Sequence, residues 1–240
     1  MKLSYNSNFS KGFLLFNDPI KVYFEQTTEP IIVNIPTVRE MIQDNNVNLF
    51  IELIKNEDYW KTNGRFVAAT RKQMLCGIIQ LLDMKNISLV FHKVFPNIDI
   101  EKSSMQVNKI EITDEQFDLL FDMLLVGCNF LTFEDFEKKG KEDENEEDKM
   151  LQDFLKKQKE AEEKLKKMRK NKADQIEFDK MAICIVSYFP QYKLQDLLEL
   201  NYYTYFKLYE WSIRREYQFV TDVAAGNGLI GDKKSYKPLF

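Results

Sequence analysis

The chain of 240 residues contains few residues that make tight turns, namely 8 glycines and 6 prolines. β-Sandwiches and barrels are built of many short strands, and their connections need such turn residues. Long helices with few connections suit this sequence better. Hydrophobic residues make up 44% of the chain and aromatic residues 13%, which is enough to bury a sizeable core. The sequence therefore predicts a mainly α (α+β) fold, a helical bundle-like domain with one or two small β-hairpins.

Two segments near the N-terminus predict the first hairpin. Ile20–Phe24 and Ile31–Ile35 are rich in β-branched and aromatic residues, and a polar stretch separates them. Thr37 and Glu40 follow with the spacing of a capping box, in which each side chain satisfies a free amide at the start of a helix. Between residues 38 and 84, apolar residues recur at intervals of three and four, which predicts helices.

A second, shorter hairpin is predicted around the turn Asn108-Lys109, between the apolar segments 105–107 and 110–112. Asn tolerates the left-handed conformation that tight turns need, although Lys suits it less well than Gly. Thr113 and Gln116 then form another capping box, which predicts a helix from this point.

The segment from about residue 137 to about residue 172 differs in kind from its surroundings. Glu142–Asp148 is almost wholly acidic, and Lys164–Lys172 is almost wholly basic. Only a thin apolar stripe lies between the two blocks, so we expect an exposed charged helix or a disordered arm. This divides the chain into an N-terminal α+β domain (1–136), a charged linker or exposed helix (137–175) and an aromatic-rich helical section (176–240).

The last section predicts three helices. The first spans residues 178 to 189 and ends at Pro190, and the second is the short segment Leu194–Leu198. The third is predicted to run from Asn201, as the N-cap, to about Ala225, with Gly226 ending the helix. Apolar residues step by three and four along one face of this final helix: Phe206, Tyr209, Ile213, Tyr217, Val220 and Ala224.

The final helix carries more aromatic rings than one buried face requires. Either other helices surround it, or some rings form a docking surface, since Tyr and Trp supply large contact areas at low entropic cost. Burial is expected for most of these rings. The candidates for partner binding are Tyr202, Tyr203, Tyr205 and Trp211.

Motifs for chemistry are weak throughout the sequence. Gly226–Gly231 matches the dinucleotide pattern G-x-G-x-x-G, but a helix precedes it and too few residues follow for a βαβ unit. His92 is the single histidine and lies beside apolar residues, which indicates a structural role. The pairs Asp114-Glu115 and Glu134-Asp135 sit at predicted helix starts, where negative charge is favourable. We therefore expect no catalytic residue, metal site or cofactor, and no enzyme activity.

The net charge, the cysteines and the apolar segments together limit which partners and which location the sequence predicts. The net charge is −4, so we do not expect nucleic-acid binding. Its only signals in the sequence are Lys164–Lys172 and Arg214-Arg215. The three cysteines are far apart and odd in number, unlike a disulfide framework. The N-terminus lacks the apolar run of a signal peptide, and no stretch is apolar enough to span a bilayer. The sequence thus predicts a cytoplasmic protein without membrane contact.

The order of segments resembles a known family. A hairpin leads into Ile35–Met41, the run Ser88–Phe95 precedes a small hairpin and its capped helix Thr113–Phe117, and a charged insert and a final helical section follow. This is similar to the tail assembly chaperones of long-tailed bacteriophages that infect low-GC bacteria.

The resemblance implies a protein of the host cytoplasm that coats the long helical tape-measure protein and prevents its aggregation without enzymatic chemistry. Exposed apolar surface and charged flanks would suit this role. Two alternatives stay open: a structural virion protein, such as a tail or baseplate adaptor, and a regulatory protein that associates with nucleic acid. Self-association is also left open.

Overall fold

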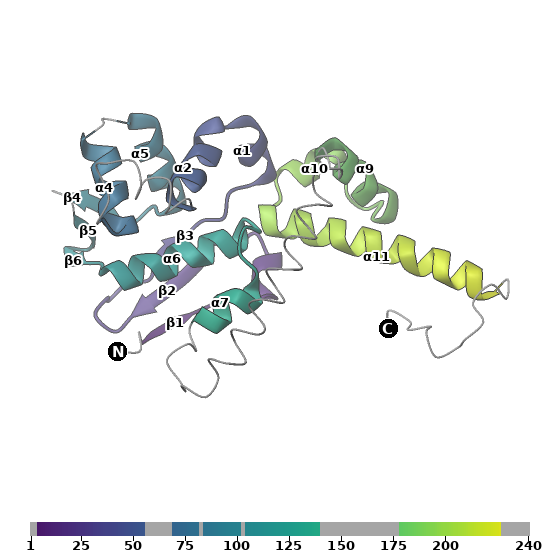
Figure 1. The fold of residues 1–240 in the computed structure, drawn as a ribbon, viewed down its shortest axis with the longest axis horizontal. Helices are drawn as coiled ribbons and strands as arrows, with labels where there is room; N and C mark the ends of the chain where they lie inside the picture. The colour runs from purple at the N-terminus through teal and green to yellow at the C-terminus, as the bar shows by residue number, and fades with distance from the viewer. Residues whose placement is uncertain (1–3, 56–68, 82–83, 102–103, 140–177, 227–240) are drawn as a thin grey trace. The chain divides into compact units, whose positions relative to one another are not determined.

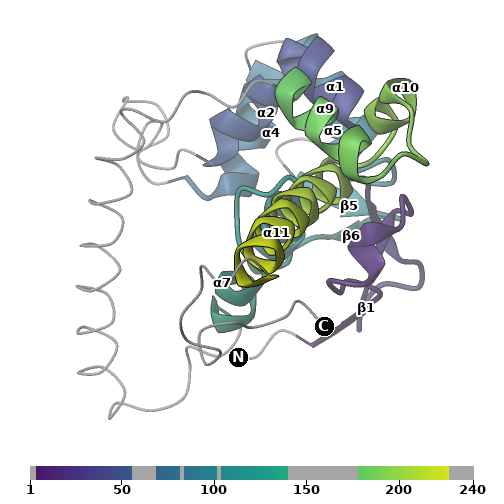
Figure 2. The ribbon, with the colours of Figure 1, turned by 90° about the vertical axis from the view of Figure 1, so that its right-hand side faces the viewer.

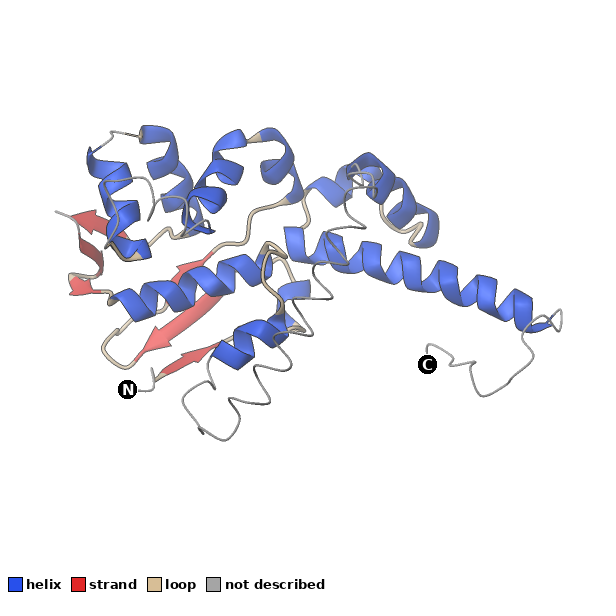
Figure 3. Ribbon diagram, viewed as in Figure 1, coloured by secondary structure: helices blue, strands red, loops and turns tan. Residues whose placement is uncertain are grey.

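The computed structural model of the chain describes residues 4–55, 69–81, 84–101, 104–139 and 178–226. Helices dominate these ranges, and the strands form two small three-stranded antiparallel sheets (Figures 1 and 3). The expected mainly α, or α+β, fold class is confirmed. The chain divides into two compact units: Met1–Phe136 with Gln195–Glu210, and Glu137–Leu194 with Trp211–Phe240.

This division differs from the expected one in the last third of the chain. The sequence suggested that residues 176–240 form one section, whereas Gln195–Glu210 pack with the first unit. Most of the predicted charged arm (137–175) lies outside the described residues, which omit 140–177. Its helical character therefore stays a prediction.

The first sheet has the order β1-β2-β3, with β1 at Tyr5–Ser7, β2 at Ile20–Phe24 and β3 at Ile31–Val33. Alternate residues of β2 and β3 are buried, whereas Lys21 and Tyr23 are exposed, so one face covers the core. The predicted hairpin is confirmed, with Val33 paired to Ile20. The strand β1 was not predicted, because its sequence is short and polar.

Helix α6 (Asp114–Gly127) is the central helix of the first unit. Residues 116, 117 and 120–127 are all buried, as expected for a helix with packing partners on every side. It runs along the β2–β3 hairpin (Figure 1), since Gln116 near its start accepts a hydrogen bond from Gln26 in the hairpin turn at 3.1 Å. At its other end, a Cβ built on Gly127 would lie 2.8 Å from Cγ1 of Ile35. A residue without a side chain lets the helix end approach the chain after β3.

The other helices of this unit surround α6. Their bounds are α1 Val38–Gln43, α2 Asn45–Lys55, α4 Arg71–Leu81 and α5 Lys85–Val94, and α7 (Phe133–Lys139) begins in the unit. Both predicted capping boxes are present, at Thr37 before α1 and Thr113 before α6. A line of phenylalanine rings connects α2, α6 and α5, with neighbouring centroids 5.4–6.4 Å apart, in the order Phe50, Phe121, Phe117, Phe95 and Phe91. These rings form the centre of the core.

Ion pairs fix α4 against α6. Asp114, Asp118 and Asp122 recur every four residues and so share one face of α6. Arg71 Nη1 lies 3.2 Å from Oδ1 of Asp122 and 3.7 Å from Oδ1 of Asp118, and Lys72 Nζ lies 3.3 Å from Oδ1 of Asp114. Lys72 and Asp122 are buried, so a helix placed differently would leave charges without partners in the core.

The second sheet contains β4 (Asp99–Glu101), β5 (Ser104–Val107) and β6 (Ile110–Glu111) in that order. The predicted hairpin around Asn108-Lys109 is confirmed, with Val107 paired to Ile110. Asn108 and Lys109 have φ values of 50° and 67°, as a two-residue type I′ turn requires. The strand β4 was not predicted.

The C-terminal helices agree with the sequence prediction. They are α9 (Phe178–Tyr188), α10 (Leu194–Leu198) and α11 (Tyr202–Gly226). The helix α9 stops before Pro190 as expected, and α11 ends at the predicted glycine.

The turn of the second sheet allows a first prediction. Lys109 is exposed and holds a left-handed conformation that glycine adopts without strain, so Lys109→Gly should stabilise the chain by about 0.5–1 kcal/mol. The measurement is the midpoint of urea unfolding. Asn108→Gly is the control and should change the midpoint less, because Asn already tolerates this conformation. A lower midpoint for Lys109→Gly would contradict the turn geometry.

Candidate functional site

The start of α11 is built into the first unit through Asn201. Its side chain is only 3% exposed, and its Oδ1 accepts a hydrogen bond from the Thr204 amide at 2.8 Å, which confirms the predicted N-cap. Its Nδ2 donates to the carbonyls of Leu14 at 2.9 Å and Phe16 at 3.3 Å. One buried amide thus joins the helix to the loop between β1 and β2.

Main-chain hydrogen bonds strengthen this junction. The Val38 amide donates to the carbonyl of Leu200 at 3.0 Å, and the Tyr202 amide donates to the carbonyl of Pro36 at 3.1 Å. The Thr204 hydroxyl donates to the carbonyl of Leu14 at 3.1 Å. The first turns of α11 are therefore held both by the N-terminal loop and by the entry to α1.

The three candidate tyrosines lie in this buried part of α11. Tyr202, Tyr203 and Tyr205 are all buried, and Tyr205 is only 1% exposed. Burial raises the pKa of Tyr202 to about 12 and also raises the pKa of Tyr203. The Tyr202 ring packs on Phe206 with centroids 4.8 Å apart. We therefore revise the docking hypothesis at these three positions, because their rings belong to the core of the first unit.

Trp211, the fourth candidate, lies in the part of α11 that belongs to the second unit, and it is 38% exposed. Five further large apolar residues of this part are exposed, among them Phe219 and Val223. The other three recur at helical spacing: Ile213, Tyr217 and Val220. They lie four and three residues apart and so share one face. We call these three residues the exposed stripe. Tyr217 is 74% exposed and Val220 is 59% exposed.

Helix α9 covers a different face of α11. Ser212 is fully buried and its side chain forms a hydrogen bond with that of Cys184 in α9. Arg215 Nη1 donates to the carbonyl of Tyr188 at 3.0 Å. The Arg215 guanidinium also lies 5.2 Å from the ring centre of Phe189. Figure 2 looks nearly along α11 and shows α9 on one side of it. The helical spacing places Ser212 and Arg215 on another side from the exposed stripe.

The three cysteines are free thiols, and two of them are buried. Burial raises the pKa of Cys76 to about 11 and also raises that of Cys128 and Cys184, so all three thiols are protonated at neutral pH. Within the described ranges, no group of three or more His, Cys, Asp or Glu residues could hold a metal ion. His92 is exposed near the end of α5.

Other sequence signals lie partly outside the described residues. The basic stretch Lys164–Lys172 is not described, whereas Arg214 and Arg215 are exposed on α11. Most of the G-x-G-x-x-G match is also not described, but its first residue, Gly226, ends α11. The helices that the structure describes include none that is long and apolar enough to cross a membrane.

Comparison of the chain with protein-family models, with curated proteins and with solved structures finds no match. The resemblance to phage tail assembly chaperones therefore stays a hypothesis. The periodicity of the final helix identified the residues of the exposed stripe, but it did not predict that they would be exposed to solvent.

Asn201 provides a test of how α11 is anchored. Asn201→Ala should destabilise the chain by about 2–4 kcal/mol, because the helix loses its cap, the Phe16 carbonyl loses its donor and the Leu14 carbonyl keeps only the Thr204 hydroxyl. Asn201→Ser should lose less, since Ser retains an N-cap oxygen. As a control, Asn17→Ala removes an exposed donor to the Glu199 carbonyl and should change stability by about 1 kcal/mol or less. If the three variants unfold at the same urea concentration, the claim that Asn201 anchors the start of α11 is contradicted.

The cysteines allow a prediction about pH. The pKa of Cys76 rises from 9.0 to about 11 on folding, so the folded chain keeps a proton that the unfolded chain loses. The stability that depends on this thiol is complete below pH 9 and falls as the pH rises towards 11.

In native protein at pH 8, iodoacetamide should modify Cys184 before the buried Cys76 and Cys128. Peptide mass spectrometry measures the order, and equal rates in native and urea-unfolded protein would contradict it.

Proposed function

We propose that the chain is a non-enzymatic binding protein that holds an apolar helical segment of another protein on the exposed stripe of α11. The observation that carries this proposal is the exposure of Ile213, Tyr217 and Val220 on one face of a helix whose first turns are anchored in a core. Apolar residues at such spacing are the anchors by which helices dock on partners. Trp211 is a further exposed ring at the base of this part.

The role that fits this surface best is that of a phage tail assembly chaperone acting in the host cytoplasm. A tape-measure protein is a long helical chain whose apolar seams need cover before the tail tube assembles. A chaperone for it needs exposed apolar residues for contact and charged neighbours for solubility. Arg214, Arg215 and Glu216 lie between Ile213 and Tyr217 in sequence and are exposed, so charged side chains flank the stripe. The resemblance in segment order supports the same role.

The energetics set the size of the expected effect. Full burial of a large apolar side chain contributes about 1.5–3 kcal/mol, and these residues are already partly covered. Replacing all three by Gln should therefore weaken a complex by roughly 3–5 kcal/mol, which is more than about 100-fold in Kd. Gln is a good helix former, so the helix itself should persist.

The test is co-expression of this chain with a long tape-measure-like helical protein from the same phage, followed by pull-down and sizing. The unchanged chain should keep the partner soluble in a stable complex. The variant Ile213→Gln/Tyr217→Gln/Val220→Gln should lose the partner while its circular dichroism stays unchanged. The matched control, Leu49→Gln/Leu89→Gln, removes exposed apolar residues from α2 and α5 and should retain the partner.

Other outcomes distinguish the alternatives. Retention of the partner by the triple variant would reject the exposed stripe as the docking surface. Absence of any complex, together with this chain at fixed copy number in purified virions, would favour a structural tail or baseplate protein. Binding that falls steeply with salt would favour nucleic acid as the ligand.

A further inference from the structure

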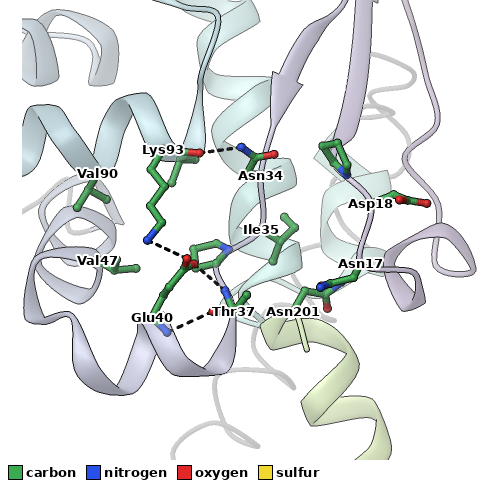
Figure 4. Close-up of a pocket in the computed structure, with 13 residues that line it drawn as sticks. Asn17, Asp18, Asn34, Ile35, Thr37, Glu40, Val47, Val90, Lys93 and Asn201 are labelled. Carbon is green, nitrogen blue, oxygen red and sulfur yellow. Dashed lines mark hydrogen bonds and ion pairs between the residues drawn. The ribbon is translucent and has the colours of Figure 1, made fainter. Parts of the chain in front are cut away.

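A small cavity lies within the first unit, beside the junction that anchors α11 (Figure 4). Its volume is about 220 Å³, below the roughly 300–1,000 Å³ typical of pockets for whole small-molecule ligands. The ion pair of Lys93 Nζ with Glu40 Oε1, at 2.8 Å, lies between Val90 on one side and Asn17 on the other. The cavity is too small and too divided to admit a helix. A further element of a helical partner therefore needs an open surface, which α11 provides outside the exposed stripe.

A second row of apolar residues lies on the part of α11 that belongs to the second unit. Phe219 is 67% exposed and Val223 is 46% exposed. They are four residues apart, so they lie one above the other on one face of the helix. We call these two residues the second row. Phe219 comes directly before Val220 of the exposed stripe, and one residue turns an α-helix by about 100°. The second row therefore faces a different direction from the exposed stripe.

Helix α9 already packs on the face of α11 that carries the second row. Ser212 lies seven residues before Phe219, which is about two turns of helix, so the two residues share this face. Ser212 is buried and forms a hydrogen bond with Cys184 of α9. The chain itself thus shows that this face of α11 accepts a packed helix.

The helix α9 ends before it reaches the second row. Its residue Cys184 contacts Ser212, and its last residue, Tyr188, accepts the hydrogen bond from Arg215 Nη1 at 3.0 Å. Since the later residue of α9 meets the later residue of α11, the C-terminal end of α9 points towards the C-terminal end of α11. The second row follows one and two turns after Arg215, where α11 extends beyond α9 (Figure 1). The interface with α9 therefore continues onto apolar residues that the described helices leave exposed.

One helix of a partner cannot cover both the exposed stripe and the second row. Packed helices lie about 8–10 Å apart and meet along one side of each helix, whereas the two rows face directions about 100° apart. Two partner helices packed on these rows would have axes roughly 15 Å apart, so they would not overlap. An apolar surface of this width is typical of a helix with neighbours on two sides.

We propose that the second row docks a second helix of the partner, in line with α9, while the exposed stripe holds the first. The partner then presents two amphipathic helices to α11, either as a helical hairpin of one chain or as two copies of one helix. This inference rests on the docking proposed for the exposed stripe. It adds the class of partner, which is a pair of helices and not a single one.

The test places the photocrosslinking residue p-benzoylphenylalanine at Tyr217 or at Phe219 of the full chain, in complex with the co-expressed tape-measure-like protein. These positions are two residues apart, so they point to nearly opposite sides of α11. After irradiation, peptide mass spectrometry should find the partner crosslinked from both positions. Crosslinks to two separate segments of one partner chain would assign the pair to a hairpin. Crosslinks to one segment, with two partner chains joined to a chain that carries the residue at both positions, would assign it to two copies.

The affinity of the complex measures the contribution of the second row. Phe219→Gln/Val223→Gln should weaken the complex about 10–50-fold, because these side chains become buried when the second helix docks. Gln is a good helix former, so the circular dichroism should stay unchanged. The matched control, Leu49→Gln/Leu89→Gln, also removes two exposed apolar side chains and should leave Kd unchanged.

The outcomes separate this inference from the docking on which it rests. If the partner is crosslinked from Tyr217 but not from Phe219, the exposed stripe docks a single helix and the second row takes no part. Crosslinks from both positions to one segment of a single partner chain, a crosslink from Phe219 to a second copy of this chain, or an unchanged Kd for Phe219→Gln/Val223→Gln would also overturn the helix pair. If neither position is crosslinked to the partner, the docking on the exposed stripe fails as well.

Discussion

The side chain of Asn201 is the constraint on which the first unit depends. Its amide is buried, so each of its polar atoms needs a partner, and it finds them in Thr204 and in carbonyls up to 187 residues away in sequence. This bond set joins the two ends of the chain in one core. The adjacent main-chain bonds from Val38 to Leu200 and from Tyr202 to Pro36 hold the entry of α1 in the same junction. The first unit is consequently complete only with residues 195–210 present.

The same helix serves two physical roles. At Tyr202–Tyr205 its rings are buried and complete a core, whereas at Ile213, Tyr217 and Val220 its apolar face is exposed. The backbone of these residues is already helical, which lowers the entropy lost when a partner docks. Within the second unit, Arg215 and Ser212 connect this part of the helix to α9 and the residue Tyr188 at its end.

Local signals in the sequence predicted most of the secondary structure correctly. The capping boxes at Thr37 and Thr113, the turn at Asn108 and the N-cap at Asn201 depend on residues within four positions, so one sequence suffices to identify them. Long-range features were not predicted. The strand β1 is short, and it pairs with the edge of β2, which is distant in sequence. Residues 195–210 pack with the first unit, where the buried side-chain amide of Asn201 bonds to the distant carbonyls of Leu14 and Phe16. Helical periodicity identifies a face, but whether a neighbour covers it is decided by tertiary packing.

The most direct test of this account is hydroxyl-radical footprinting of the full chain, alone and in complex with a tape-measure-like helical partner. The account predicts strong labelling of Ile213, Tyr217 and Val220 in the free chain and their protection in the complex. Tyr202 and Tyr205 should be protected in both states. Labelling of these two tyrosines in the free chain, or an exposed stripe that stays equally labelled in the complex, would contradict the claim that α11 is core at its start and a docking surface further along.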